Sequence, residues 1–314
     1  MRRADSTLVA LVAALFVLLV LGLLLPKWLF LLTLSLGKGL VVLGLMLLLR
    51  TGLVSFGQGL FYCLGAYAVG SLGQFLGIKD ALLLLLTGVA IGSLVAFLLG
   101  FLMARYRDIF FAMLSLAFSM ILYGLLVKTA ALGSTDGFNV TPPALLGRPI
   151  GGEAHQYALF ALACMLAFLA ALVMHVYFET PLGRLSPAIR DNEIRVEYMG
   201  ASVRHAIHVK YVIAGALAGL GGALTAMTVG HIDPDLAYWT TSGEFVFVTI
   251  LSGTGSVIAP FLGSLVFEVI RTYAYQYSPN TWQLVVGSAL LIMIVFLPSG
   301  LWSVFAYLRR RSSS

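Results

Sequence analysis

Charged residues are scarce in this sequence. Only 10% of its 314 residues are Asp, Glu, Lys or Arg, whereas 60% are hydrophobic. Soluble globular proteins carry about 25% charged and about 45–50% apolar residues. A water-soluble fold of this length would lack the polar side chains to cover its surface. The composition therefore predicts an integral membrane protein whose outer surface faces the lipid bilayer.

Cysteines and clusters of metal-ligating residues are also few. The two cysteines, Cys63 and Cys164, both lie in apolar runs, and they give neither a disulfide framework nor a metal-ligand spacing. The five histidines are scattered along the chain, without a metal cluster and without the elements of a Ser-His-Asp set. We therefore expect no metal, no cofactor and no catalytic residues.

No nucleotide-binding motif is present. The pattern G-x-x-x-x-G-K-[ST] is missing, and Gly37-Lys38-Gly39 lies inside an apolar run without the required leading glycine. The net charge of +6 does not indicate a nucleic-acid partner, because the basic residues follow the distribution that orients membrane proteins. The sequence thus predicts a protein that is not an enzyme and that binds no nucleic acid.

Long apolar runs dominate the chain, and a helix of about 20 apolar residues is enough to cross the hydrocarbon core. A further apolar stretch, 245–267, is broken by Ser252–Ser256 and by Pro260. The pattern predicts an all-α polytopic membrane protein, a single transmembrane domain over 1–314, with about eight transmembrane helices plus a broken or re-entrant helix pair. The expected spans are 8–25, 29–49, 53–76, 81–104, 109–127, 157–178, 211–230 and 282–297.

Lysine and arginine are distributed unevenly between alternate connections. With the N-terminus in the cytoplasm, most basic residues fall inside, as the positive-inside rule requires. The pattern predicts cytoplasmic termini, a cytoplasmic segment 179–210 and a periplasmic loop 133–156. It also requires 245–267 to enter and leave on the outer side or to cross twice as short helices. The inside residues are Arg2, Arg3, Arg50, Arg105, Arg107, Arg184, Arg190, Arg195, Arg204, Lys210 and Arg309 to Arg311, and Lys27, Lys79, Lys128, Arg148 and Arg271 fall outside.

The first run, 8–25, follows two arginines, as the apolar part of a signal peptide does. No small-x-small cleavage site follows it, and the chain leads directly into the next apolar run. We expect it to be a retained helix.

Interrupted helices indicate where a substrate pathway could lie. The span 53–76 is rich in glycine, and Ser252–Gly263 interrupts a second span in the other half of the chain. Paired interruptions of this kind point to a translocation site, although small residues also serve close helix packing. Both interpretations stay open. The candidate pathway residues are Lys38, Ser55, Gly57, Gln58, Gly59, Ser242, Gly243, Glu244 and Gly253.

Lys38 is the one charge in the middle of a predicted span. A charge at that depth costs at least about 2.5 kcal/mol, so it needs a partner or water. A structural ion pair and a pathway role remain equally open for Lys38. An interfacial or snorkelling position suits Glu244, Glu268 and Arg271.

The longest polar segment, 179–210, contains a predicted helix. Acidic and basic residues alternate along it, and the apolar residues Ile189, Ile194, Tyr198 and Met199 are expected to line one face. Gly200 follows as a helix-ending residue. The segment is either a solvated charged face or a docking element for a partner. The candidate coupling residues are Arg190, Asp191, Glu193, Arg195, Glu197 and Gly200.

Several motifs occur in the order found in one transporter family. They include Leu53-Val-Ser-Phe-Gly-Gln-Gly59, Ser134-Thr-Asp-Gly137, Ala188-Ile-Arg-Asp-Asn-Glu-Ile-Arg195, Ser242-Gly-Glu244 and Leu297-Pro-Ser-Gly-Leu301. With these motifs the chain, from about residue 38 to residue 305, resembles the permeases of branched-chain amino acid ATP-binding-cassette importers, the LivM type.

The resemblance implies a set of partners. A second homologous permease, of the LivH type, would pair with this chain in the bacterial inner membrane. Two cytoplasmic ATPase subunits would drive the permease pair, and the cytoplasmic segment of this chain would dock into the ATPase. A periplasmic binding protein would deliver the substrate. Related permeases carry urea, aromatic or short-chain carboxylates, so those substrates stay open beside branched-chain and other amino acids. The alternative class is a self-sufficient secondary transporter or channel that couples to ions through Lys38 and Glu244.

Overall fold

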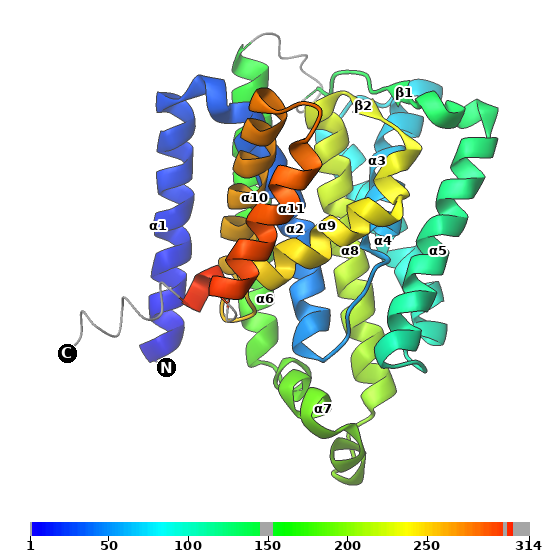
Figure 1. Cartoon of the computed structure of the whole chain (residues 1–314), viewed down its shortest axis with the longest axis vertical. Coiled ribbons are helices and arrows are strands. Elements are labelled where there is room, and N and C mark those ends of the chain that lie inside the picture. The colour runs from blue at the N-terminus through cyan, green and yellow to red at the C-terminus, as the bar shows by residue number, and fades with distance from the viewer. Residues whose placement is uncertain (1, 145–152, 298–299, 304–314) are drawn as a thin grey trace.

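The computed structural model describes residues 2–144, 153–297 and 300–303 (Figure 1). Nearly all of this part is helical, which confirms the predicted all-α fold. Residues Arg148, Pro298 and Arg309 to Arg311, with the C-terminus, lie outside the described residues. The helices are α1 (Arg2–Leu24), α2 (Leu29–Arg50), α3 (Gln58–Phe75), α4 (Ala81–Met103), α5 (Asp108–Lys128), α6 (Glu153–Glu179), α7 (Pro181–Tyr198), α8 (Val203–Val229), α9 (Trp239–Ser252), α10 (Ala259–Tyr277) and α11 (Trp282–Phe296).

Six of the described helices are long and apolar enough to cross a membrane, and they include α1, α2, α4, α5, α6 and α8. Helices α3, α9, α10 and α11 are shorter. Short 3₁₀ turns cover Pro26–Trp28, Ala130–Leu132, Ser134–Asp136 and Pro234–Ala237. The only strands described are β1 (Phe138–Asn139) and β2 (His231–Ile232), which pair antiparallel. They lie at the end of the bundle opposite α7 (Figure 1).

Helix α8 forms the centre of the bundle and packs mainly against α4, α2 and α3. The contacts are close because glycines meet across the interfaces. A β-carbon on Gly219 would lie 2.3 Å from the carbonyl oxygen of Gly88 in α4, and one on Gly222 would lie 1.9 Å from that of Tyr62 in α3. Small residues at such positions let helix backbones approach in a membrane. The packing interpretation therefore holds for the glycines of α8 and for Gly65, which faces Gly219.

Helix α3 begins at Gln58, later than the predicted start at residue 53. The preceding stretch, 51–57, is turn and irregular backbone, yet Leu53 is 2% exposed and Ser55 is fully buried. Irregular backbone is tolerated at membrane depth only where protein or water covers it. Here protein covers it, and the glycine-rich span is a broken element with its break inside the bundle.

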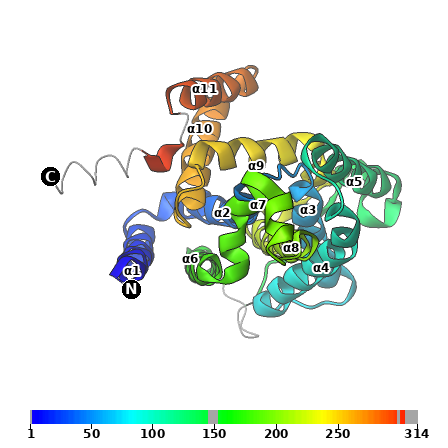
Figure 2. The same ribbon diagram turned by 90° about the horizontal axis from the view of Figure 1, so that it is seen from below.

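The second interrupted stretch consists of two short helices, α9 and α10, joined by residues 253–258. Figure 1 shows α9 running toward the end where α7 lies and α10 returning. This confirms that the stretch is a broken helix pair. Helix α1 begins and α11 ends toward the end of the molecule that carries α7, and Figure 2 shows α7 covering the middle of that end.

The polar segment between α6 and α8 differs from the prediction in two respects. Helix α8 begins at Val203 and not at residue 211, so Lys210, expected in a cytoplasmic loop, is fully buried in the bundle. The basic and polar residues in its first turns lower the local hydropathy, so the sequence pattern placed the start of the helix too late. Helix α7 is kinked at Asn192, whose backbone is extended (φ −163°, ψ 100°).

Candidate functional site

Four charged side chains from three helices meet inside the bundle. Lys38 of α2 lies with its Nζ 2.5 Å from Oε1 of Glu268 in α10 and 3.8 Å from Oε2 of Glu244 in α9. Arg271 of α10 places Nη1 3.1 Å from Glu244 Oε2 and 3.9 Å from Glu268 Oε1. We call these residues the charge quartet. Its two acids and two bases balance, so each charge has the partner that its depth requires.

The quartet is unequal in its exposure. The Glu268 and Lys38 side chains are 3% and 12% exposed, whereas those of Glu244 and Arg271 are 27% and 35% exposed. The first pair therefore holds α2 and α10 together in a dry environment. The second pair faces an open space and is accessible to water or to a small solute.

That space is a cavity of about 450 Å³. The quartet lines it together with apolar and aromatic side chains and three threonines, and charged or polar groups among apolar ones are typical of small-molecule sites. The cavity is lined by Leu34, Lys38, Tyr62, Thr225, Val229, Leu236, Thr241, Glu244, Glu268, Arg271, Thr272, Tyr275 and Trp282.

The local sequence explains how Lys38 reaches its partners. Glycines flank it on both sides, and a β-carbon on Gly39 would lie 2.5 Å from the Phe261 ring of α10. A β-carbon on Gly37 would lie 2.9 Å from the Thr225 hydroxyl of α8. The two glycines let α8 and α10 close on α2 beside the lysine. Glu268 and Arg271, spaced i, i+3, then lie on the face of α10 that meets it.

Glu268 and Arg271 were missing from the predicted site. An interfacial position suited them from sequence, but Glu268 is buried and paired with Lys38. The available signal was an acid and a base one turn apart in an otherwise apolar stretch. Lys38 and Glu244, which were predicted, are brought together by the fold.

A second group of predicted pathway residues lies around the start of α3. The amide of Gly59 donates to Ser242 Oγ at 3.0 Å, and the amide of Gly57 donates to Ser55 Oγ at 3.3 Å. A β-carbon on Gly59 would lie 2.6 Å from Ser242 Oγ, so this contact needs glycine. The serines thus satisfy amides that the broken helix leaves open.

Gln58 belongs to the same group and is fully buried, and neither polar atom of its side-chain amide has a hydrogen-bond partner within the described residues. Gly243 lies next to Ser242 in α9, with open space where its β-carbon would be. Gly253 lies apart from both groups, in the α9–α10 turn, with φ +79°.

Helix α7 carries the predicted coupling residues. Glu193 Oε2 accepts from Arg107 Nε at 2.6 Å, which ties α7 to the connection between α4 and α5. Beyond the kink, Asn192 Oδ1 accepts from the amide of Arg195 at 2.9 Å and starts a second short helical turn. The helix ends at Tyr198, and Gly200 takes φ +87°. Exposed residues on α7 include Arg190, Asp191, Arg195 and Glu197.

The predicted single apolar face of α7 is wrong, because the kink divides it. Ile189 is buried, whereas Ile194, Tyr198 and Met199 are 63%, 88% and 68% exposed. Val196 takes the inner position beyond the kink. The outer turn of α7 therefore presents apolar side chains amid both signs of charge.

Over the described ranges no group of three or more His, Cys, Asp or Glu could hold a metal ion. Cys63 and Cys164 are free and buried.

Comparison with known proteins gives a coherent result. The family model described as "Branched-chain amino acid transport system / permease component" matches residues 27–295. The chain is 28% identical over 289 residues to the high-affinity branched-chain amino acid transport permease protein LivM of Escherichia coli K12, covering 85% of this chain and 66% of that protein. This chain thus spans just under two thirds of the length of that relative.

Two further relatives are more distant. The permease protein LivH of Salmonella typhimurium is 24% identical, with 80% of this chain and 85% of that protein covered. The permease protein BraD of Pseudomonas aeruginosa is also 24% identical, with 80% and 86% covered. No solved structure matches the chain.

Proposed function

This chain belongs to the family of branched-chain amino acid transport permease components, and from that membership we propose that it is the transmembrane permease subunit of an ATP-binding-cassette importer for branched-chain or other amino acids. It is a transport subunit and not an enzyme. In this proposal it lies in a bacterial inner membrane with both termini in the cytoplasm.

The observation that carries the proposal is the charge quartet beside its cavity. Buried ionisable groups in membrane helices mark substrate or ion pathways, because a charge at that depth is expensive unless it is used or paired. Glu244 and Arg271 are only partly buried and face the cavity. They offer an acceptor for an ammonium group and a donor for a carboxylate, and the leucine, valine and aromatic side chains that line the same cavity suit an aliphatic side chain.

The other predicted pathway residues take a supporting part in this proposal. Ser55, Gly57, Gln58 and Gly59 form the broken start of α3, and Ser242 and Gly243 of α9 lie against it. This part of the bundle would move when the pathway opens. Gly253 would be the hinge of the α9–α10 turn. Lys38 of α2 would hold the α9–α10 pair in place through its ion pair with Glu268.

An importer without a nucleotide motif needs a partner that hydrolyses ATP. Two ATPase subunits would drive the pair of permeases, and we assign the ATPase contact of this chain to α7, because its outer turn exposes Ile194, Tyr198 and Met199 beside the charged residues Arg195 and Glu197. Aromatic residues and Met are typical of interface cores, with charges at the rim. A second homologous permease and a periplasmic binding protein complete the proposed assembly.

Uptake by the assembled complex tests the proposal. The full chain is reconstituted with its partner subunits in liposomes, and ATP-dependent uptake of radiolabelled leucine is measured with and without the binding protein. We expect uptake that needs ATP and that falls in the Glu244→Gln variant but not in Glu179→Gln, whose side chain lies exposed on α6. Uptake without ATPase subunits would instead favour a secondary carrier.

The orientation has its own test. Thr135 is exposed and lies three residues before β1, and β1 lies at the end of the bundle opposite α7 (Figure 1). A cysteine at that position is expected to react with an impermeant maleimide in intact spheroplasts. Reaction only after lysis would invert the proposed topology.

A further inference from the structure

Three arginines line a second cavity, at the end of the bundle where α7 lies. Arg50 of α2 and Arg184 and Arg190 of α7 surround a space of about 450 Å³, and Asp191 is the only acidic residue in its lining. Basic pockets between transmembrane helices near the membrane surface are the type of site that takes phospholipid head groups. We call this space the arginine cavity.

The arginines are held in place but have donors to spare. The Arg50 guanidinium lies 3.9 Å from the centroid of the Phe178 ring, and its Nε donates to the Thr254 carbonyl at 2.8 Å. The stem of Arg190 packs against Gly52, and its guanidinium has no hydrogen bond or ion pair to any described residue. Arg184 pairs with Glu179 at 2.8 Å, exposed to solvent.

A buried hydroxyl completes the lining. Ser186 is 1% exposed, and its Oγ has no partner in the described part of the chain. An unpaired buried hydroxyl is unfavourable, and a ligand that accepts a hydrogen bond from it would remove that cost. Guanidinium groups and a hydroxyl together suit a phosphate group, which accepts several hydrogen bonds.

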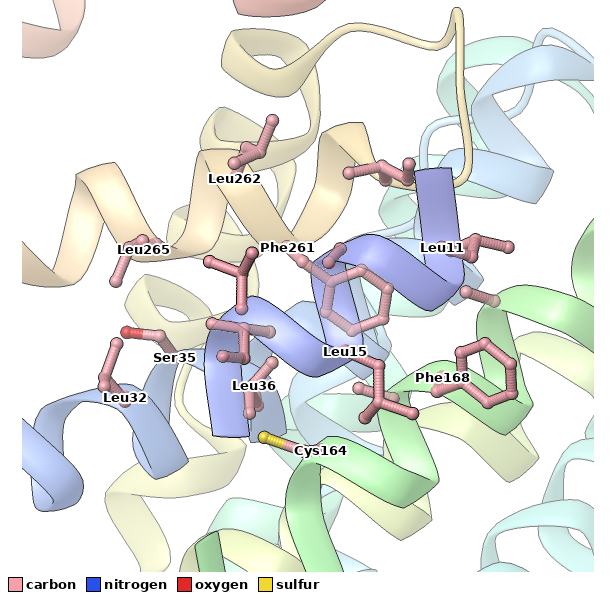
Figure 3. A pocket seen from close by; sticks show the side chains of 16 residues that line it. Leu11, Leu15, Leu32, Ser35, Leu36, Cys164, Phe168, Phe261, Leu262 and Leu265 are labelled. Atoms are coloured by element: carbon pink, nitrogen blue, oxygen red, sulfur yellow. The ribbon is translucent and has the colours of Figure 1, made fainter. Parts of the chain in front are cut away.

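A separate cavity lies within the bundle between α1, α2, α6 and α10 (Figure 3). Its volume is about 240 Å³, and its walls are apolar side chains such as Leu15, Leu36 and Phe261. The one hydroxyl that lines it, on Ser35, donates to the Leu31 carbonyl at 2.7 Å. We call it the apolar cavity. Helix α1 closes one side, and only 11% of its membrane span is buried.

The two cavities border the same three segments of the chain at different positions, with no lining residue in common. Both are bordered by α2, by α6 and by the segment that connects α9 with the start of α10. On α6, Ala171 lines the apolar cavity and Phe178 the arginine cavity, and these positions are about 10 Å apart along a helix. One leaflet of hydrocarbon is about 15 Å thick, so a single amphiphile can reach from one cavity into the other.

We propose that one anionic phospholipid occupies these two cavities, with its phosphate among Arg50, Arg184 and Arg190 and an acyl chain between α1, α2, α6 and α10. The apolar cavity favours a lipid over free phosphate, because a free phosphate has no apolar part that would fill it. It likewise argues against an acidic side chain of a protein partner. The site lies apart from the charge quartet and does not depend on the proposed transport function.

The test uses the full chain, purified in detergent and titrated with phosphatidylglycerol or phosphatidylcholine, with bound lipid counted by native mass spectrometry. Each arginine near an anionic lipid contributes about 1 kcal/mol, which is about a five-fold change in affinity. We expect Arg184→Gln and Arg190→Gln each to weaken phosphatidylglycerol binding about five-fold. Both residues are exposed, so neither change threatens folding. Arg204→Gln, exposed on α8 outside the cavity, is the matched control.

A second variant tests the acyl chain. Ala167 lines the apolar cavity, and Ala167→Phe fills it without touching an arginine. We expect this variant to weaken binding at least as much as a single arginine change, and we expect 10 mM inorganic phosphate not to compete. Competition by phosphate with no effect of Ala167→Phe would show a free-phosphate site and overturn the proposal. Equal loss in Arg204→Gln, or equal affinity for phosphatidylcholine, would overturn it as well.

Discussion

Replacing Lys38 with methionine is expected to destabilise the bundle, because it leaves Glu268 without its nearest cation. The Glu268 side chain is 3% exposed and that of Lys38 12% exposed, with 2.5 Å between their charged atoms. Removing one partner of a buried ion pair costs about 3–5 kcal/mol, because the other charge stays buried. Arg271, 3.9 Å from Glu268, remains and compensates in part. The loss is therefore expected at the lower end, about 3 kcal/mol.

The double variant Lys38→Met with Glu268→Gln separates this explanation from a simple loss of packing. It removes both buried charges and leaves the Glu244–Arg271 pair balanced at 3.1 Å. Replacement of a whole buried pair by well-packed neutral groups is often close to neutral in stability. We therefore expect the double variant to recover most of the stability lost in Lys38→Met.

The measurement is equilibrium unfolding in detergent, followed by tryptophan fluorescence and by gel filtration of the folded fraction. Glu179→Gln serves as the control, because it removes an ion pair whose side chains are 61% and 69% exposed. Pairs exposed to this extent contribute little, so no change is expected. A Lys38→Met protein as stable as the wild type, or a double variant as unstable as the single one, would refute the reasoning.

Three further predictions concern other parts of the chain. Gly65→Ala places a methyl group 2.0 Å from the Gly219 carbonyl oxygen, and we expect it to lower the free energy of unfolding by about 1–3 kcal/mol in the same assay. Gly124→Ala, in open space, is the control and is expected to raise that free energy by about 0.5–1 kcal/mol. Equal effects of the two changes would contradict the close packing of α8. Glu197→Arg on α7 is expected to abolish substrate-stimulated ATP hydrolysis at unchanged expression, and normal uptake would place the ATPase contact elsewhere. The pKa of Asp233 is raised, first by burial and then by a neighbouring aspartate, so its ionisation lowers the stability of the fold as the pH rises through the folded pKa. We expect Asp233→Asn to raise the melting temperature at pH 7 and to leave it unchanged at pH 3. A gain of equal size at both pH values would exclude this cause.

Helices α1, α2, α4, α5, α6 and α8 were predictable because their apolar runs have the length that a bilayer requires. The break at Ser252–Ser256 also predicted two helices in place of one long span, as α9 and α10 show. Lys38 signalled its need for a partner through its depth alone. The identity of that partner was not predictable, because Glu268 lies 230 positions further along the chain. Contacts of that range depend on how α2, α9 and α10 pack.

Local competition explains the remaining differences. The first two turns of α8 carry Arg204, His205, His208 and Lys210, so their hydropathy indicates a loop even though the helix continues. The kink in α7 comes from Asn192, whose side chain caps the next turn. Asparagine at that point competes with the helix backbone for hydrogen bonds. The resulting kink separates buried Ile189 from exposed Ile194, Tyr198 and Met199, which the sequence placed on one apolar face.

The distance in sequence between Lys38 and its partners has a consequence for biosynthesis. Helix α2 leaves the ribosome long before Glu268, which lies 230 residues later, and chains grow at about 5–20 residues per second. Lys38 therefore spends roughly 10–50 seconds without its acid, at a depth where an unpaired lysine costs about 2.5–3.5 kcal/mol. Helix α8, the centre around which α2, α3 and α4 pack, is also made late. We therefore expect the early helices to stay in contact with the translocon or an insertase until the C-terminal third has been synthesised. Glu268 then neutralises Lys38, and α8 completes the packing of the bundle.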